Sequence, residues 1–187
     1  MRRGPHDGGV LKVRIHLIAV GSRMPDWVAG GFEDYARRLP RECSLVLHPV
    51  EASLRGRVLP ADRLREVEGE RLLAAVPTGS RVVALDERGD AWTTADLAQH
   101  LAHWLSGGTD VALLVGGAEG LDRACLERAH DVWSLGPLTL PHMLVRVIVA
   151  EQIYRAWSIL AGHPYHRAAA SAWAPAAGRS GRCRGRA

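Results

Sequence analysis

The sequence predicts an α/β protein with a mainly parallel sheet and helices on both of its faces. From residue 13 to residue 160, short β-branched segments alternate with longer segments of helical periodicity, which is the order of repeated strand–helix–strand units. The segment 110–115 is almost continuously apolar, as is typical of a central parallel strand that helices cover on both sides. The chain has 187 residues, 47% of them hydrophobic, which suits one domain with a sizeable core.

The elements can be assigned in order along the chain. Residues 13–20 are rich in β-branched side chains and end at Gly21, so they predict the first strand. Pro25 favours the start of a helix, and the apolar spacing that follows continues to about residue 39. Further strands are expected at 44–50, 81–86, 110–115 and 131–135, a turn at 87–90, and further helices at 60–76, 94–106, 121–130 and 142–160.

The positive charge lies at the two ends of the chain. The formal net charge is +4, but residues 13–167 hold 17 Arg against 19 Asp and Glu, so a basic face across the domain is not indicated. Residues 168–187 are mostly Ala, Gly, Ser, Arg and Pro and show no periodicity. We therefore expect a flexible N-terminal extension at 1–12, a single domain at 13–167 and a disordered Arg-rich tail at 168–187.

Cysteine spacing and hydropathy argue against a metal site, a secreted protein and a membrane protein. Cys43, Cys125 and Cys183 lack the spacing of a zinc site or of a disulfide framework. No signal-peptide pattern begins the sequence, and charged residues interrupt the longest apolar segment, 143–160. We expect a cytoplasmic protein that holds no metal and enters no membrane.

Two loops after predicted strands are unusual, and ligands of parallel sheets bind in such loops. The glycine loop 116–120 fits neither a dinucleotide fingerprint nor a phosphate loop, so it predicts either a cofactor loop or an ordinary strand-to-helix turn. The apolar loop 136–141 contains two prolines and one hydroxyl. It predicts either the wall of an adenine pocket or a buried crossover connection.

The last predicted helix, 142–160, is apolar around most of its circumference. It needs cover on two sides, and a second copy of the protein is the simplest cover for the side away from the sheet. Glu151 and Arg155 are spaced i,i+4, which predicts a surface ion pair. The segment 163–167 then combines two imidazoles, a phenol and a guanidinium. It offers a general base, a stacking surface and a phosphate anchor, or else only a polar helix cap.

Several long motifs, in the right order, resemble the SPOUT-class methyltransferases of the ribosomal RNA large subunit, which modify N3 of a pseudouridine. The resemblance covers roughly residues 13–167. The motifs that carry it are VGSRMPDWV at 20–28, LLVGGAEGL at 113–121, WSL at 133–135, LTLPH at 138–142, LVRV at 144–147, EQIYRAWS at 151–158 and HPYHR at 163–167.

The resemblance implies a fold, a cofactor and partners. It implies a C-terminal trefoil knot, which is rare among chain topologies, and S-adenosylmethionine bound at that knot. It also implies a homodimer built around the last helix, with a pseudouridine in a 23S rRNA stem-loop on the assembled ribosome as substrate. The positions that it implies for the cofactor are Leu85, Gly117, Gly136, Pro137, Leu138, Thr139, Leu140 and Pro141.

The chemistry suggests which residues act on the substrate. N3 of pseudouridine is nucleophilic only after it loses its proton, so a base and a nearby cation would lower the barrier. We expect His166 to remove or relay this proton and Arg167 to stabilise the anion or to bind a backbone phosphate. Tyr165 would stack on the base or orient it, and His142 is an alternative base.

The sequence departs from the family pattern in places, and two other functions remain open. Ala118 stands where the family usually has Pro, and Arg55 and Arg57 stand in a stretch that is usually lysine-rich. Family members generally end near the position of Arg167, but here 20 residues follow it. One alternative is a non-catalytic, ribosome-associated RNA-binding factor that uses the Arg-rich ends. The other is a SPOUT methyltransferase acting on tRNA, for which the predicted single domain offers no separate RNA-binding domain.

Overall fold

The computed structural model describes residues 12–52 and 60–166. The predicted N-terminal extension (apart from Lys12), Arg55, Arg57, Arg167 and the predicted tail therefore lie outside the described residues. The elements are β1 (Val13–Val20), α1 (Asp26–Ala36), β2 (Cys43–Val50), α2 (Ala61–Ala74), β3 (Arg81–Ala91), α3 (Thr94–Gly107), β4 (Val111–Val115), α4 (Arg123–Arg128), β5 (Asp131–Ser134), α5 (His142–Leu160) and a short 3-10 turn at Pro164–His166.

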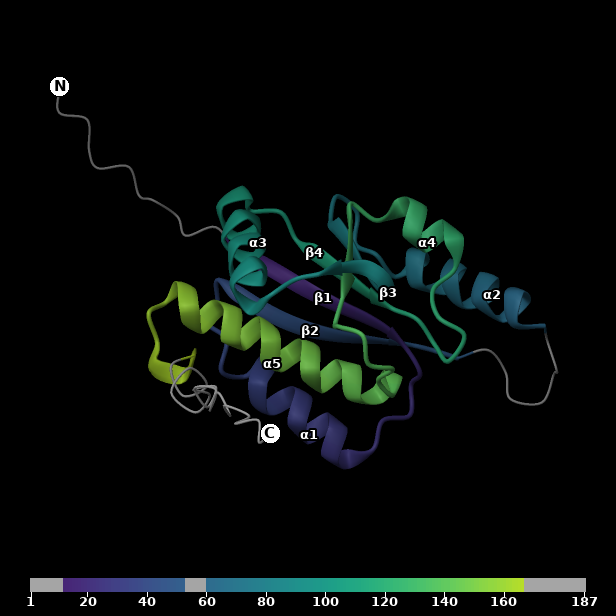
Figure 1. Ribbon diagram of the computed structural model, residues 1–187, viewed down its shortest axis with the longest axis horizontal. Helices are drawn as coiled ribbons and strands as arrows, with labels where there is room; N and C mark the ends of the chain where they lie inside the picture. Colours follow the sequence, from purple (N-terminus) through teal and green to yellow (C-terminus); the bar gives the residue numbers. More distant parts are fainter. Residues whose placement is uncertain (1–11, 53–59, 167–187) are drawn as a thin grey trace, which may run out of the picture.

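The sheet has the order β2-β1-β4-β3-β5, and every neighbouring pair in it is parallel. Helices α1, α3 and α5 pack their apolar residues on one face, and α2 and α4 on the other (Figure 1). The predicted α/β class with helices on both faces is confirmed. The trefoil knot that the resemblance implies stays a prediction.

Two predicted boundaries were wrong. A turn was expected at 87–90, but β3 continues to Ala91, because its register with β5 shifts after Leu85 and pairing resumes between Asp90 and Trp133. Gly89 permits this close approach, since a Cβ there would lie 2.6 Å from the Val132 carbonyl oxygen. Helix α4 is shorter than the predicted 121–130, because the Asp122 carboxylate accepts a hydrogen bond from the Ala124 N–H and so caps the helix start.

Arg146 lies in the polar stripe of the last helix, yet its side chain is completely buried. Its Nη2 donates to the carbonyl oxygens of Val20 (2.8 Å) and Gly21 (2.5 Å), which ties α5 to the end of β1. Burial lowers the pKa of Arg146, although a guanidinium stays protonated at neutral pH. Gly21 fits closely beside it, with φ at +105° and a Cβ position only 2.7 Å from Met143 Cε.

A histidine pair joins β1 to β2 near the opposite, amino-terminal edge of the sheet. His16 Nδ1 and His48 Nε2 are 2.9 Å apart, and His16 Nε2 lies 3.4 Å from Asp110 Oδ2. The other oxygen of Asp110 accepts from the Arg14 N–H at 2.8 Å. Burial, and secondly the neighbouring His16, lower the pKa of His48.

We expect Arg146→Lys to lower the free energy of unfolding by about 1–3 kcal/mol, because the more strongly hydrated ammonium costs more to bury and lacks the second nitrogen that contacts Met24 Sδ. Urea denaturation monitored by circular dichroism measures this change. Arg63→Lys, which alters an exposed pair with Glu66, is the control and should change stability very little. Equal stabilities for the two variants would contradict the structural role assigned to Arg146.

The His16–His48 pair predicts a pH dependence of stability. Because the folded state lowers the pKa of His48, the unfolded state binds protons more readily as the pH falls below about 6.5. The free energy of unfolding should therefore decrease between about pH 7 and pH 5, and His48→Gln should flatten this dependence. Urea midpoints across this range test it, with exposed His103→Gln as the control. Identical slopes for wild type and His48→Gln would contradict the prediction.

Candidate functional site

A cavity of about 710 Å³ opens at the carboxyl-terminal edge of the sheet. Residues 85–88 of β3, the loops after β4 and β5, helix α4 and the start of α5 form most of its walls. Six of the eight predicted cofactor positions line it, namely Leu85, Gly117, Gly136, Leu138, Thr139 and Leu140. Pro137 and Pro141 belong to the same loop but do not line the cavity. The structure thus brings together loops that are far apart in the sequence.

The glycine loop after β4 is folded tightly on itself. Gly117 and Gly120 form an isolated antiparallel bridge, with the Gly120 N–H donating to the Gly117 carbonyl at 3.2 Å. Gly120 has a φ of +84°, and a Cβ on Gly116 would lie 2.5 Å from the Gly120 backbone. A Cβ on Gly117 would lie 2.5 Å from Glu68 Oε2. The loop therefore presents bare backbone to the cavity, and side chains at Gly116 or Gly117 would force this tight loop to shift.

The apolar loop 136–141 is not a buried crossover connection, so that alternative was wrong. Pro137, Leu138, Thr139 and Pro141 are exposed, and Leu138 is 77% exposed. The loop leaves β5 through Gly136, whose φ is +113° and whose N–H donates to Ser134 Oγ at 3.2 Å. Leu138 is thus an exposed apolar side chain on the wall of the cavity.

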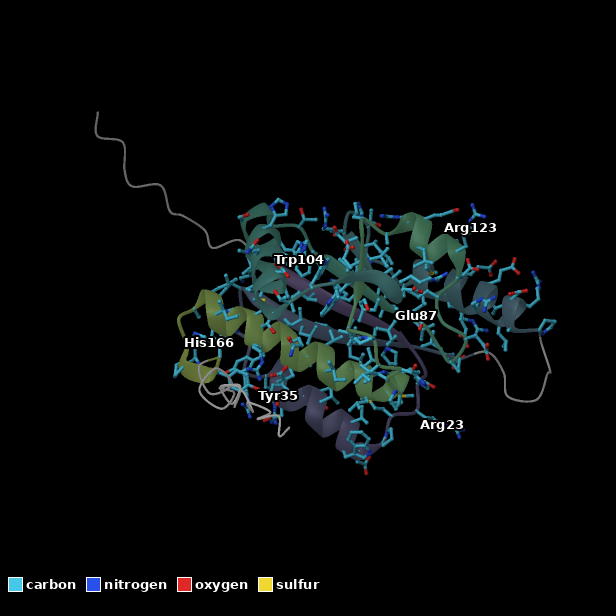
Figure 2. The ribbon with its side chains drawn as sticks, in the orientation of Figure 1. Arg23, Tyr35, Glu87, Trp104, Arg123 and His166 are labelled. Carbon is cyan, nitrogen blue, oxygen red and sulfur yellow. The ribbon has the colours of Figure 1, made fainter. Side chains whose placement is uncertain are left out.

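Polar side chains that the sequence interpretation did not single out surround the cavity. Asp86 and Arg88, in the middle of β3, form two side-chain hydrogen bonds of 2.7 and 2.9 Å, and these bonds lower the pKa of Asp86. Glu87 and Arg123 also line the cavity, and Figure 2 shows both toward the end of the molecule where α2 and α4 lie. The only sequence signal for Asp86, Glu87 and Arg88 is their position at the carboxyl end of the predicted strand 81–86 or directly after it.

The predicted catalytic residues lie at two different places. His142, at the start of α5, lines the cavity. Tyr165 and His166 follow the other end of α5, and the 19 residues of that helix span about 28 Å (Figure 2). Within one chain, the structure therefore brings His142 to the cavity but not Tyr165 or His166.

Tyr165 takes part in a half-buried network rather than standing free. Its hydroxyl donates to Glu151 Oε1 at 3.1 Å, and its ring meets the Tyr154 ring edge-on at 4.8 Å. Burial is the main cause that raises the pKa of Tyr165, so the phenol stays protonated. Glu151 also accepts from Arg155 Nε at 2.8 Å, and only 17% and 23% of these two side chains are exposed. The predicted Glu151–Arg155 pair exists, but its assignment to the surface was wrong.

His166 is half-buried and has an unsatisfied nitrogen. Its Nδ1 is shielded from solvent and has no hydrogen-bond partner within residues 12–52 and 60–166. Most buried polar atoms in proteins are paired, so this nitrogen is a notable exception. Its capacity to form a hydrogen bond is therefore not used by any residue in the described part of the chain.

In 12–52 and 60–166, no group of three or more His, Cys, Asp or Glu residues is placed to hold a metal ion. None of the helices in that part of the chain is long and apolar enough to span a bilayer.

Comparison with known proteins identifies the family. A family model described as a predicted SPOUT methyltransferase matches residues 13–166. The ribosomal RNA large subunit methyltransferase H of Thioalkalivibrio sulfidiphilus (strain HL-EbGR7) is 58% identical over 155 residues, which cover 83% of this chain and 99% of the relative. The proteins of the same name from Methylococcus capsulatus and Nitrosococcus oceani are each 53% identical to this chain. Each alignment covers 83% of this chain, and it covers 100% of the Methylococcus protein and 99% of the Nitrosococcus protein.

Solved structures align only loosely with the chain. The probable methyltransferase from Bordetella pertussis Tohama I has a TM-score of 0.49 and 16% identity, over 77% of this chain and 96% of that one. The assignment rests on the family model and on the sequence relatives instead. The chain belongs to the SPOUT methyltransferase family, among the proteins named ribosomal RNA large subunit methyltransferase H.

Proposed function

We propose that this protein is a cytoplasmic, S-adenosylmethionine-dependent enzyme that methylates N3 of a pseudouridine in a 23S rRNA stem-loop on the ribosome. The observation that carries the proposal is the cavity at the carboxyl edge of the sheet, which six predicted cofactor positions and His142 line together. The names of the relatives point to ribosomal RNA rather than tRNA, and to an enzyme rather than a binding factor.

The cavity has a suitable size and chemistry for S-adenosylmethionine. Its 710 Å³ falls within the range of small-molecule sites, roughly 300–1,000 Å³. Leu85, Leu138 and Leu140 would give an adenine ring apolar walls, and the glycine loop would let the ligand approach backbone at Gly117. When bound, this cofactor supplies an electrophilic methyl group on a sulfonium.

The protein's own contribution would be to hold the nucleotide and to remove the N3 proton. His166, with its unpartnered Nδ1, is the proposed base, and His142 at the cavity wall is the alternative. Arg167, outside the described residues, would supply a cation for the imidate oxygens or for a phosphate. Tyr165 would orient this segment as a neutral phenol, because its hydroxyl already donates to Glu151.

A homodimer would bring together the two parts of the site, the cavity and the Tyr165–His166 segment, which lie at opposite ends of α5 within one chain. A two-fold axis that crosses α5 would place the end of one α5 near the start of the other. The Tyr165–His166 segment of one protomer would then lie beside the cavity of its partner. The exposed Leu138 on the cavity wall would be covered in the same contact.

The first test concerns the cofactor. We expect Gly117→Val to raise the Kd for S-adenosylmethionine about tenfold or more, because the new side chain would collide with Glu68 and displace the glycine loop that lines the cavity. Isothermal titration calorimetry measures the Kd. Gly30→Val on α1 is the matched control, since nothing lies within 4 Å of its Cβ position. Unchanged affinity in Gly117→Val, or no binding by the wild type, would refute the proposed cofactor site.

The second test asks whether the two parts of one site come from different protomers. Gly117→Val and His166→Ala homodimers should both be nearly inactive in methylation of ribosomes that lack the modification. When the two variants are mixed and allowed to exchange subunits, the activity should recover to about a quarter of the wild-type rate, since half the dimers carry one intact site. No recovery despite proven heterodimers would show that both parts act within one chain.

A further inference from the structure

Glu151 receives hydrogen bonds from three different side chains. Its Oε1 accepts from the Tyr165 hydroxyl at 3.1 Å and from Arg155 Nε and Nη2 at 2.8 and 2.5 Å. Its Oε2 accepts from Gln152 Nε2 at 2.7 Å. The Gln152 carbonyl oxygen in turn accepts from Thr94 Oγ1 on α3 at 3.1 Å. This carboxylate is therefore fixed in position by both its own helix and a neighbouring one.

The segment that carries His166 has little structure of its own. The chain leaves α5 through Gly162, whose φ is +64°, and forms only the three-residue turn Pro164–His166. Such a short 3-10 turn has weak internal hydrogen bonding and depends on contacts with the rest of the protein. The exposed His163 only approaches the Tyr154 and Trp157 rings, at 6.4 Å between centroids, whereas Tyr165 forms a side-chain hydrogen bond to α5.

The surroundings of Tyr165 determine its orientation as well as its position. The ring packs edge-on against Tyr154 of α5, and Arg155 Cζ lies over the ring, 4.9 Å from its centroid. These contacts place the hydroxyl oxygen but leave several directions open to its O–H bond, which rotates about the Cζ–O bond. The hydrogen bond to Glu151 selects one of them, and the Arg155 guanidinium provides the opposite charge that a half-buried carboxylate requires.

We propose that Glu151 is a positioning residue for the N3 proton transfer: it holds the Tyr165 hydroxyl and thereby fixes the orientation of the adjoining His166 imidazole. This inference rests on the proposed function. Glu151 itself does not reach the cavity of its own chain, because it follows His142 by nine residues, about 13 Å along the helix axis. Its hydrogen-bonding capacity is already used by Tyr165, Arg155 and Gln152.

The test measures single-turnover methylation of unmodified ribosomes by Glu151→Gln and Tyr165→Phe. Each should lower the rate roughly 10- to 100-fold at neutral pH, which is part of what general-base catalysis contributes. The Kd for S-adenosylmethionine should not change. The defect should shrink as the pH rises, because N3 then loses its proton without help from the base. A merely structural defect would not depend on pH in this way.

The double variant decides whether Glu151 acts through Tyr165. If it does, Glu151→Gln should cost little further activity once Tyr165→Phe is present. Glu66→Gln removes a carboxylate from a surface ion pair on α2 and is the control that should keep full activity. Additive losses, or a defect that is the same at every pH, would overturn the inference. Tyr165→Phe keeps the ring, so it remains informative even if Glu151→Gln folds poorly.

A readout without catalysis separates this inference from the proposed function. Amide hydrogen exchange at Tyr165 and His166 should become faster in Glu151→Gln and in Tyr165→Phe, while exchange in the strands stays unchanged. If the wild type fails to methylate ribosomes, the proposed function is wrong, and the exchange data still report on the attachment. Unchanged exchange at these two amides would overturn the inference whatever the activity shows.

Discussion

The buried guanidinium of Arg146 is the contact on which the geometry of the site depends. It donates to the last backbone carbonyls of β1 from the second turn of α5, and so it sets where that helix begins relative to the sheet. On the same helix, His142 lies one turn before Arg146, and Val145 directly precedes Arg146. Both His142 and Val145 line the cavity. Arginine reaches both carbonyls from α5 through one nitrogen, Nη2, and these two hydrogen bonds offset part of the cost of burying its charge.

The strands and most helices could be predicted from the sequence, because each has a clear periodicity or a clear terminal residue. Residues 13–20 and 142–160 were assigned with the observed bounds. The extension of β3 could not be predicted, since 87–90 has the polar, glycine-containing composition of a turn and pairs only through a register shift with β5. Local composition does not reveal a pairing that depends on a distant strand.

The parts of the site were predictable to different degrees. The glycine and apolar loops were recognised because they follow strands, and the resemblance then supplied individual positions, most of which line the cavity. The burial of Arg146 could not be read from the helix pattern, which counts any arginine as polar. The contact between Glu151 and Tyr165 could not be predicted either. Arg155, at i,i+4, already offered the Glu151 carboxylate a partner on the same helix.

The exposed Leu138 has a thermodynamic consequence for the proposed dimer. It belongs both to the wall of the cavity and to the outer surface, so a second chain that covers it would also narrow the cavity mouth. Ligand binding and subunit association would then share one free energy of coupling. Each would strengthen the other by the same factor, and the protein concentration would become a determinant of apparent cofactor affinity.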